Sequence, residues 1–491
     1  MQQLITTMSS EEKRELLASR LRLGKLGGRP QPVSFQQQRM WFLHQMMPAS
    51  SAYNIPAAVR LTGRLDVDAW QASLTRVSIR HDVLRTTFVE VDGQPFQQLH
   101  ADHQPQMRVV DLREPVRASG LAVADLGHPT LRAAAVEEFT RPFDLEEGPL
   151  MRMCFLRTRE DEHVLLMTTH HALADVWSTT VFLNELIADY TARQRGAVAP
   201  LPPLALQYID YAAWQRQQQV SSEDLAYWRE HLHGAPAALD LPTDRPRPAV
   251  RSDSGASLPF SVDEQRMSRV RALAKQTGTT PFMVLLAAFV GTLGRYAHQD
   301  DVVIGVPVAN RNNQALQNLV GYFANMLPLR FQMATAMTLR DVLLVVRESV
   351  RHGMAHQKVM FEQIMEDIDP ERDASRSPVF QVSFIYQNVD MPDRSMGGLT
   401  FTQLEAPIRS ARFDMELQVF EEEGLSGHFE YNTDLFDAAT VEGFAAAMHT
   451  LLDAYLKDLD QPVASVGLLS EAGLRSAVVH GPVFELGPED G

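Results

Sequence analysis

The 491-residue chain has one cysteine, Cys154, which lies in a mostly apolar run. A single cysteine allows no intrachain disulfide and no cysteine-rich metal site. Positive charge is also scarce, since 45 lysines and arginines face 61 aspartates and glutamates, for a formal net charge of −16 at pH 7. An acidic surface repels nucleic-acid phosphates and anionic membranes. The composition therefore argues against nucleic acid and membrane as partners, and it favours a reducing cytoplasm.

No segment is apolar for long enough to cross a bilayer. The longest apolar run, Phe282–Leu293, stops before Arg295, whereas a spanning helix needs about 20 residues. The N-terminal region mixes Glu11, Glu12 and Glu15 with basic residues, where a signal peptide needs an uninterrupted apolar stretch. We therefore expect neither a membrane span nor a secretory signal.

Several familiar catalytic motifs are missing as well. The chain has no GxxxxGK[ST] phosphate loop, no GxGxxG dinucleotide turn, no HExxH zinc motif and no GxSxG nucleophile elbow. Nucleotide chemistry and zinc-protease chemistry thereby lose their usual sequence support. No metal site is predicted.

What is present is the composition of a folded α/β protein in two large parts. Hydrophobic residues make up 45% and charged residues 22% of the chain, which are ordinary globular values. The segment 236–248 holds four prolines and should be an extended crossover, because proline fixes φ and removes a backbone donor. We expect a lead-in helix and linker over 1–30, lobes over 31–235 and 236–465, and a linker to a following domain over 466–491.

Apolar runs with strand character alternate with helix-length amphipathic stretches in both parts. Such alternation predicts mixed α/β structure rather than a helical bundle. Strands are expected over 57–61, 86–91, 163–169, 302–308 and 379–387, and helices over 67–80, 262–276, 280–296 and 339–356.

One strand runs directly into two adjacent histidines, His170 and His171. Neighbouring side chains at a strand end point to opposite sides, so one imidazole can face a cleft while the other packs inward. Asp175 then precedes an amphipathic stretch, where a helix N-cap belongs. From these residues alone, a cap and two ordinary packed histidines explain the pattern as well as a catalytic site does.

Seven segments in order extend the pattern across about residues 32–460 and resemble the condensation domains of nonribosomal peptide synthetases, within the chloramphenicol acetyltransferase-like superfamily. The third segment, His170–Asp175, matches the HHxxxDG motif of that family except at its last position. The other six are Ser34–Leu43, Arg80–Phe88, Tyr208–Trp214, Ile304–Arg311 with Gly321–Asn325, His356–Glu362 and Arg376–Phe384. Two of them, Arg80–Phe88 and Tyr208–Trp214, have mainly architectural interpretations: a helix-to-strand junction and an apolar anchor.

The resemblance implies two acetyltransferase-like α/β lobes forming a V around a central tunnel. Upstream donor and downstream acceptor carrier domains, among neighbouring synthetase domains, would present thioesters on 4'-phosphopantetheine arms, with no cofactor bound by the chain itself. The family's roles make His171 the catalytic residue and His170 a structural neighbour, and they pair Asp175 with an arginine, for which Arg311 is the candidate. Amide formation would then need only a neutral imidazole, whose unperturbed pKa is about 6.5.

The chain departs from the family motif at Val176, where glycine is usual. A β-branched side chain there should crowd the route to His171, since glycine serves where another group approaches the backbone closely. Neutral drift is one explanation. The other is a changed reaction, as in modified-amino-acid condensation domains, which eliminate water from a β-hydroxy aminoacyl thioester with or without condensation. Epimerisation uses the same motif but is disfavoured, because the distinctive later motifs of that subtype are not found. Heterocyclisation is disfavoured because those domains replace the two histidines by a DxxxxD pattern, and a catalytically silent scaffold because it would usually lose the motif.

Overall fold

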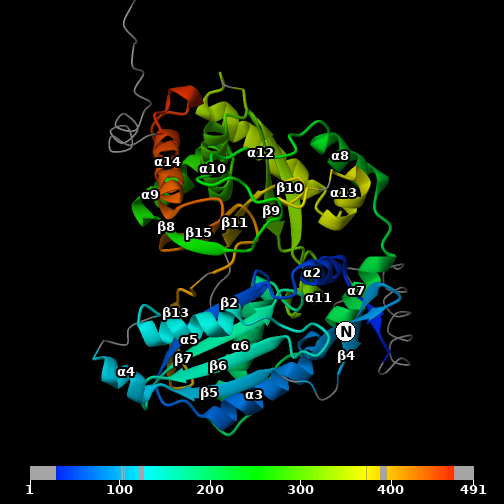
Figure 1. Ribbon diagram of the computed structural model, residues 1–491, viewed down its shortest axis with the longest axis vertical. Helices are drawn as coiled ribbons and strands as arrows, with labels where there is room; N and C mark the ends of the chain where they lie inside the picture. Colours follow the sequence, from blue (N-terminus) through cyan, green and yellow to red (C-terminus); the bar gives the residue numbers. More distant parts are fainter. Residues whose placement is uncertain are drawn as a thin grey trace, which may run out of the picture.

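The computed structural model describes residues 29–468, apart from 101–102, 104, 121–125, 335, 372, 388–394 and 408. The lead-in expected over 1–30 and the linker expected over 466–491 therefore lie almost wholly outside the described residues. Two lobes stand one above the other, each built on a six-stranded sheet (Figure 1). The predicted mixed α/β architecture is confirmed.

The first lobe is a sheet with helices on both faces. Its strand order is β12 (Ser395–Met396), β13 (Leu399–Leu404), β2 (Asn54–Thr62), β7 (Glu162–His170), β6 (Met151–Arg157) and β5 (Gln106–Asp111). Along β6, Met153 and Phe155 pack into the core shared with α3 (Val67–Arg80) and α6 (Val176–Arg193), while Cys154 and Leu156 pack into a second core with α4 (Arg113–Ser119) and α5 (Pro129–Thr140). Burial on both faces explains the continuous apolar runs Met153–Leu156 in β6 and Val164–Met167 in β7.

Three smaller elements complete the first lobe beside this sheet. Strands β1 (Gln31–Pro32), β4 (Gln94–Leu99) and β3 (Thr86–Val91) form a separate three-stranded sheet. Helix α2 (Phe35–Met46) and helix α7 (Tyr208–Gln217) pack against each other. A short helical turn, η2 (Asp82–Arg85), joins α3 to β3, as expected of a helix-to-strand junction.

The second lobe has its own sheet and a largely separate core. Its strand order is β10 (Asn325–Gln332), β9 (Asp301–Val308), β11 (Val382–Gln387), β14 (Met415–Glu422), β15 (Gly424–Asn432) and β8 (Gly255–Val262). The helices of this lobe are α8 (Ser222–Leu232), α9 (Glu264–Thr277), α10 (Pro281–Ala297), α12 (Leu339–Ala355), α13 (Phe361–Ile368) and α14 (Ala438–Lys457), with the turn η3 (Val463–Ser465) at the end. The short helix α11 (Gln314–Gln317) packs into the core of the first lobe.

Helix α10 is the central helix of the second lobe and accounts for the longest apolar run. It packs against α9, α12 and α14, and twelve of its seventeen residues are buried. In the described part of the chain no single helix meets the length and hydropathy of a membrane span; only α9 and α10 together do, and they meet at a bend of 100°.

Periodicity located most elements closely. The strand expected from residue 57 begins at Asn54, and two further misplaced starts have local causes. The predicted bounds of α3 and β3 are those observed. The helix expected from residue 262 begins at Glu264, because Val262 is the last residue of β8. The strand expected from residue 379 begins at Val382, because Val379 has a φ of 67° in a tight turn closed by a hydrogen bond from the Phe380 N–H to the Pro378 carbonyl at 2.8 Å. The segment 236–248 contains no helix or strand, as expected.

Three segments cross between the two parts of the chain. Strand β13, from the second part, pairs with β2, and Leu399 enters the core of the first lobe. The segment 311–324 contributes Leu319, Tyr322 and Phe323 to the same core. Helix α8, from the first part, places Trp228 in the core of the second lobe. The division expected at residue 236 therefore follows neither the two sheets nor the two cores completely, because β12 and β13, from the second part of the chain, belong to the sheet of the first lobe.

The crossing strand is predicted to contribute strongly to stability. Replacing Leu399, which is fully buried, with alanine should cost about 2–5 kcal/mol of unfolding free energy, because it leaves a cavity in the core of the first lobe. Leu344→Ala on α12 is the matched control, since Leu344 is exposed, and it should change stability by about 0.5 kcal/mol or less. Urea unfolding monitored by fluorescence measures both, and equal effects would show that β13 is not part of this core.

Candidate active site

His170, the last residue of β7, is an internal structural residue. Its side chain is buried between the rings of His44 and Phe143, with centroid separations of 6.1 and 6.0 Å. Its Nδ1 accepts a hydrogen bond from the Ala172 N–H at 3.2 Å. Burial, reinforced by the positive charges of its neighbours, lowers the pKa of His170 to about 3. The imidazole is therefore neutral near pH 7.

His171 follows the strand and turns toward the boundary between the lobes. Its backbone N–H donates to the Tyr53 carbonyl at 2.8 Å, and its ring lies against the ring of Tyr322 with the centroids 4.3 Å apart. Nδ1 is buried with no hydrogen-bond partner outside its own residue in the described chain. Strand alternation thus separates the two histidines as predicted, with only His171 leaving the core.

The environment of His171 favours the neutral imidazole. Burial is the largest cause and the positive charges of Arg412 and Arg39 act in the same direction, so that the pKa falls to about 4 although Asp175 opposes the shift. This value is well below the unperturbed 6.5 expected from the sequence. Near pH 7 the ring can accept a proton, but it is a weaker base than a free histidine.

Asp175 holds together two distant segments of the chain. It is the N-cap of α6, with its Oδ1 accepting from the Ser178 N–H at 2.7 Å. The same oxygen accepts from Arg311 Nη2 at 3.2 Å, and Oδ2 accepts from the Phe323 N–H at 3.0 Å. The expected pair with Arg311 is present, and so is the cap, which the sequence presented as an alternative.

Arg311 completes this junction from the other side. It is buried, donates to the Leu316 and Leu319 carbonyls, and its guanidinium lies 4.1 Å from the centre of the Phe323 ring. Burial lowers the pKa of Arg311, while Asp175 opposes that shift. The pair therefore fixes the whole segment 311–324 beside the start of α6.

Gly321 shows how tightly this segment is packed. A Cβ built on Gly321 would lie 1.9 Å from Cδ2 of Tyr208, so only glycine fits. The Tyr208 hydroxyl donates to the Tyr322 carbonyl at 2.6 Å and contacts Ser34 Oγ at 2.8 Å. The apolar-anchor interpretation of Tyr208–Trp214 is thus supplemented by a buried polar link.

Val176, the departure from the motif, is the first residue of α6 and is half-buried. It is not among the residues with positive φ, so the backbone here takes a conformation that any residue adopts. The fold gives no conformational reason for glycine at this position.

Sequence reasoning did not identify Tyr322, Arg39 or Arg412 as neighbours of His171, nor Glu362 as the partner of Arg39. Tyr322, Arg39 and Glu362 lie in the motifs named above. Their contact could not be predicted, because the three residues come from segments far apart in the chain. Arg412 lies near His171 and forms an ion pair with Glu416. No group of three or more histidine, cysteine, aspartate or glutamate side chains suited to a metal ion occurs within the described ranges.

Two α/β lobes with a neutral imidazole where they meet define a two-lobed protein of the chloramphenicol acetyltransferase-like fold. The model of the condensation-domain family matches residues 29–476. The chain therefore belongs to this family, the condensation domains of nonribosomal peptide synthetases.

Curated relatives agree with this assignment. The chain is similar to one of the linear gramicidin synthase proteins of Brevibacillus parabrevis, at 43% identity over 90% of this chain and 6% of that protein. It is also similar to a phosphinothricin tripeptide synthetase of Streptomyces viridochromogenes, at 35% identity over 97% of this chain and 45% of that protein. The chain thus spans a small part of the first of these relatives and less than half of the second.

Solved structures share the fold. The X-domain from teicoplanin biosynthesis, in complex with OxyB, superimposes with a TM-score of 0.77 at 28% identity, over 90% of this chain and 97% of that one. A four-domain nonribosomal peptide synthetase bound to AMP and glycine gives a TM-score of 0.81 at 24% identity, over 90% of this chain and 34% of that one. The second likeness concerns the fold alone.

Breaking the buried ion pair should be costly. Asp175→Ala leaves Arg311 charged and buried, which typically costs about 3–5 kcal/mol of unfolding free energy, and it also removes the cap of α6. Asp460→Ala is the control, because Asp460 pairs with Arg340 on the surface, where water screens the attraction and the pair contributes little to stability. A urea unfolding series compares them, and a loss no larger for Asp175→Ala than for Asp460→Ala would contradict the role of this junction.

The two histidines should make the fold sensitive to acid. A histidine whose folded pKa is lowered stabilises the fold fully above its unfolded value of about 6.5, and that contribution is lost as the pH falls toward the folded value. His170→Asn keeps an acceptor for the Ala172 N–H and removes one such group, so the slope of unfolding free energy against pH below 6.5 should fall by up to about 1.4 kcal/mol per pH unit. His298→Asn, at an exposed helix end, should leave the slope unchanged. Parallel slopes for wild type and His170→Asn would show that His170 is not held neutral.

Proposed function

We propose that this domain joins two acyl groups held as thioesters on carrier domains. The amine of the acceptor attacks the carbonyl carbon of the donor thioester, the new C–N bond forms, and the C–S bond breaks to release the thiol of the donor's phosphopantetheine arm. One proton leaves the nitrogen and one is delivered to the departing sulfur. The membership in the condensation-domain family over residues 29–476 carries the proposal.

In this reaction His171 is the catalytic residue. Its neutral ring suits a group that accepts a hydrogen bond from the incoming amine and then takes its proton. A pKa of about 4 makes the imidazole a weak base toward a free amine, but the nitrogen becomes strongly acidic once it has attacked the carbonyl. We infer that the proton moves after the C–N bond forms, so a weak base suffices.

Much of the acceleration would come from positioning. Two thioester arms that meet end to end react as if in one molecule, which can supply about 7–11 kcal/mol of the barrier. His170 then supports the strand end, and Asp175 with Arg311 fixes the segment that carries Tyr322 against the catalytic ring. These roles require one imidazole at the reacting atoms and no bound cofactor on this chain.

The partners follow from the relatives, which are multidomain synthetases. An upstream carrier domain would present the donor and a downstream carrier domain the acceptor, each on its own 4'-phosphopantetheine, with further synthetase domains on either side. The acidic composition with one cysteine fits an enzyme that works in the cytoplasm.

Amide formation is favoured over dehydration of a β-hydroxy aminoacyl thioester. The relatives named above are peptide synthetases. Val176 begins α6 and is not among the residues with positive φ, so the backbone at this position does not need glycine. We interpret Val176 as a tolerated substitution.

The test is a single-turnover assay with loaded donor and acceptor carriers, read by intact-protein mass spectrometry. His171→Ala should lower amide formation by about 100-fold or more, the scale of lost acid–base catalysis, with little change in melting temperature because His171 is only half-buried. His170→Asn is the control and should retain most of the activity.

A β-hydroxy aminoacyl donor extends the same assay. The product should carry the summed mass of the donor and acceptor acyl groups. A product lighter by the mass of one water, about 18 Da, would favour the dehydrating reaction instead. Full activity of His171→Ala would show that His171 takes no part in the reaction.

A further inference from the structure

The phenol ring of Tyr322 forms one wall of the position that His171 occupies. The two ring centroids lie 4.3 Å apart with an angle of 48° between the planes, and Tyr322 is almost fully buried. Because Nδ1 of His171 has no hydrogen-bond partner outside its own residue within the described chain, no side-chain hydrogen bond at that atom orients the ring. Packing against Tyr322 is therefore a main restraint on its orientation.

The backbone of Tyr322 is held on both sides. Its carbonyl accepts from the Tyr208 hydroxyl at 2.6 Å, and the N–H of the next residue, Phe323, donates to Asp175 at 3.0 Å. Asp175 belongs to the same short loop as His171, only four residues later. Tyr322 is thus tied, through the next residue, to a carboxylate on the loop that carries His171.

The hydroxyl of Tyr322 is anchored at its far end. Arg39 of α2 donates from Nη2 to this hydroxyl at 2.7 Å. Burial raises the pKa of Tyr322, so the phenol stays protonated, and the oxygen that Arg39 uses is an acceptor. The Tyr322 hydroxyl therefore anchors the side chain and does not act as an acid or a base.

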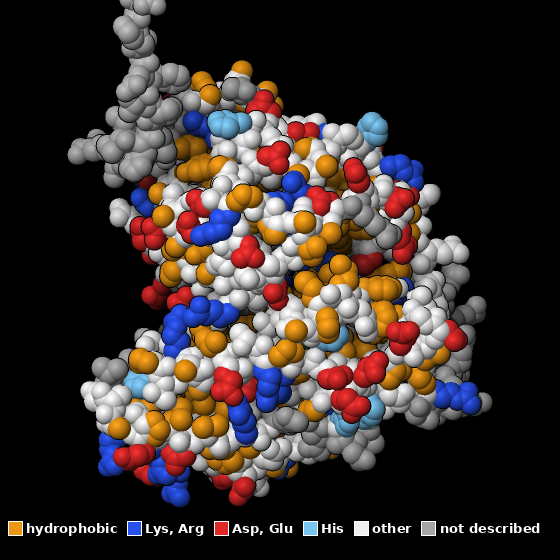
Figure 2. All heavy atoms as spheres, viewed as in Figure 1, with side chains coloured by type: hydrophobic (Ala, Val, Ile, Leu, Met, Phe, Trp, Pro, Cys, Tyr) orange, Lys and Arg blue, Asp and Glu red, His pale blue; other side chains and the backbone are white. Residues whose placement is uncertain are grey.

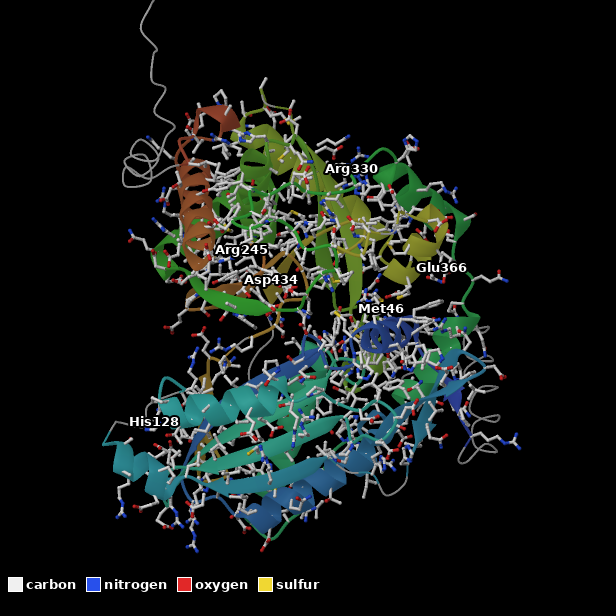
Figure 3. The ribbon with its side chains drawn as sticks, in the orientation of Figure 1. Met46, His128, Arg245, Arg330, Glu366 and Asp434 are labelled. Atoms are coloured by element: carbon white, nitrogen blue, oxygen red, sulfur yellow. The ribbon has the colours of Figure 1, made fainter. Side chains whose placement is uncertain are left out.

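Arg39 is itself tied across the boundary between the lobes. Its Nη1 lies 3.2 Å from Oε1 of Glu362 on α13, with both side chains mostly buried. Helices α2 and α13 are in contact, and Figure 3 shows Met46 of α2 and Glu366 of α13 on facing sides of this boundary. Hydrophobic side chains gather on the same side of the waist between the lobes (Figure 2).

We propose that Tyr322 is a positioning residue that sets the orientation of the His171 imidazole, and that Arg39, held by Glu362 of the second lobe, anchors it. The chain of contacts runs from α13 through Arg39 and Tyr322 to the catalytic ring. The orientation of the base thereby depends on the two lobes being in their mutual contact. The inference rests on the proposed function of His171.

A small displacement of the ring has a large effect on rate, because a misplacement of about 1 Å can cost about 100-fold. Tyr322→Leu removes the ring and should lower kcat by about 10–100-fold, while KM for the carrier substrates stays unchanged, since the residue is buried and offers a carrier domain almost no surface. Tyr322→Phe removes the anchoring hydrogen bond, and Arg39→Gln removes it together with the ion pair to Glu362. Each should lower kcat by about fivefold. The double variant should be no slower than the slower single variant, because both changes break one link.

The matched control is Tyr455→Phe. Tyr455 is a buried tyrosine of α14 whose hydroxyl has no hydrogen-bond partner in the described chain, so its loss should leave kcat unchanged. Melting temperatures accompany every variant. If Tyr322→Leu does not fold, the kcat values of Tyr322→Phe and Arg39→Gln still test the proposal.

A second readout does not depend on turnover. In protein labelled with [13Cε1]histidine, the His171 resonance, assigned by its absence in His171→Gln, should carry the ring-current shift of Tyr322 and lose it in Tyr322→Leu. An unmoved resonance together with an unchanged kcat overturns the proposal. If His171→Ala retains activity, the proposed function fails instead; if His171→Ala is inactive and Tyr322→Leu is fully active, only the positioning role fails.

Discussion

The contact of one buried carboxylate with two segments of the chain is the constraint on which the site depends. Asp175 accepts hydrogen bonds from the first turn of α6, from Arg311 and from the Phe323 N–H. Burying this charge is unfavourable unless each partner is in place, so the segment 311–324 has to cross from the second part of the chain into the core of the first lobe. The fold and the site are therefore specified by the same contacts.

Because of this arrangement, the two adjacent histidines have different surroundings. His170 ends a strand and stays inside, whereas His171 leaves the strand and lies against Tyr322, a residue of the crossing segment. Burial and nearby arginines keep the ring of His171 uncharged. A neutral imidazole can accept a proton, and this is the role that the proposed function gives to His171.

Local patterns in the sequence predicted those structural features that depend on residues close together in the chain. Hydrophobic periodicity gave the bounds of α3 and β3, and strand alternation gave the separation of His170 from His171. The Asp175–Arg311 pair came only from resemblance to the family. Tyr322, Arg39 and Glu362 could not be connected, because they meet only when α2, the crossing segment and α13 come together. The pairing of β13 with β2 and the depressed pKa of His171 depend on the same nonlocal packing, which no local period encodes.

The structure holds His171 as a neutral imidazole at the junction fixed by Asp175. The most direct test is a pH titration of [13Cε1]histidine-labelled protein by NMR, with His171 assigned by comparison with His171→Gln. We predict that the His171 resonance keeps the chemical shift of the neutral ring as the pH falls below 6, and that it begins to change only as the pH approaches about 4. A midpoint near the unperturbed value of about 6.5 would contradict it.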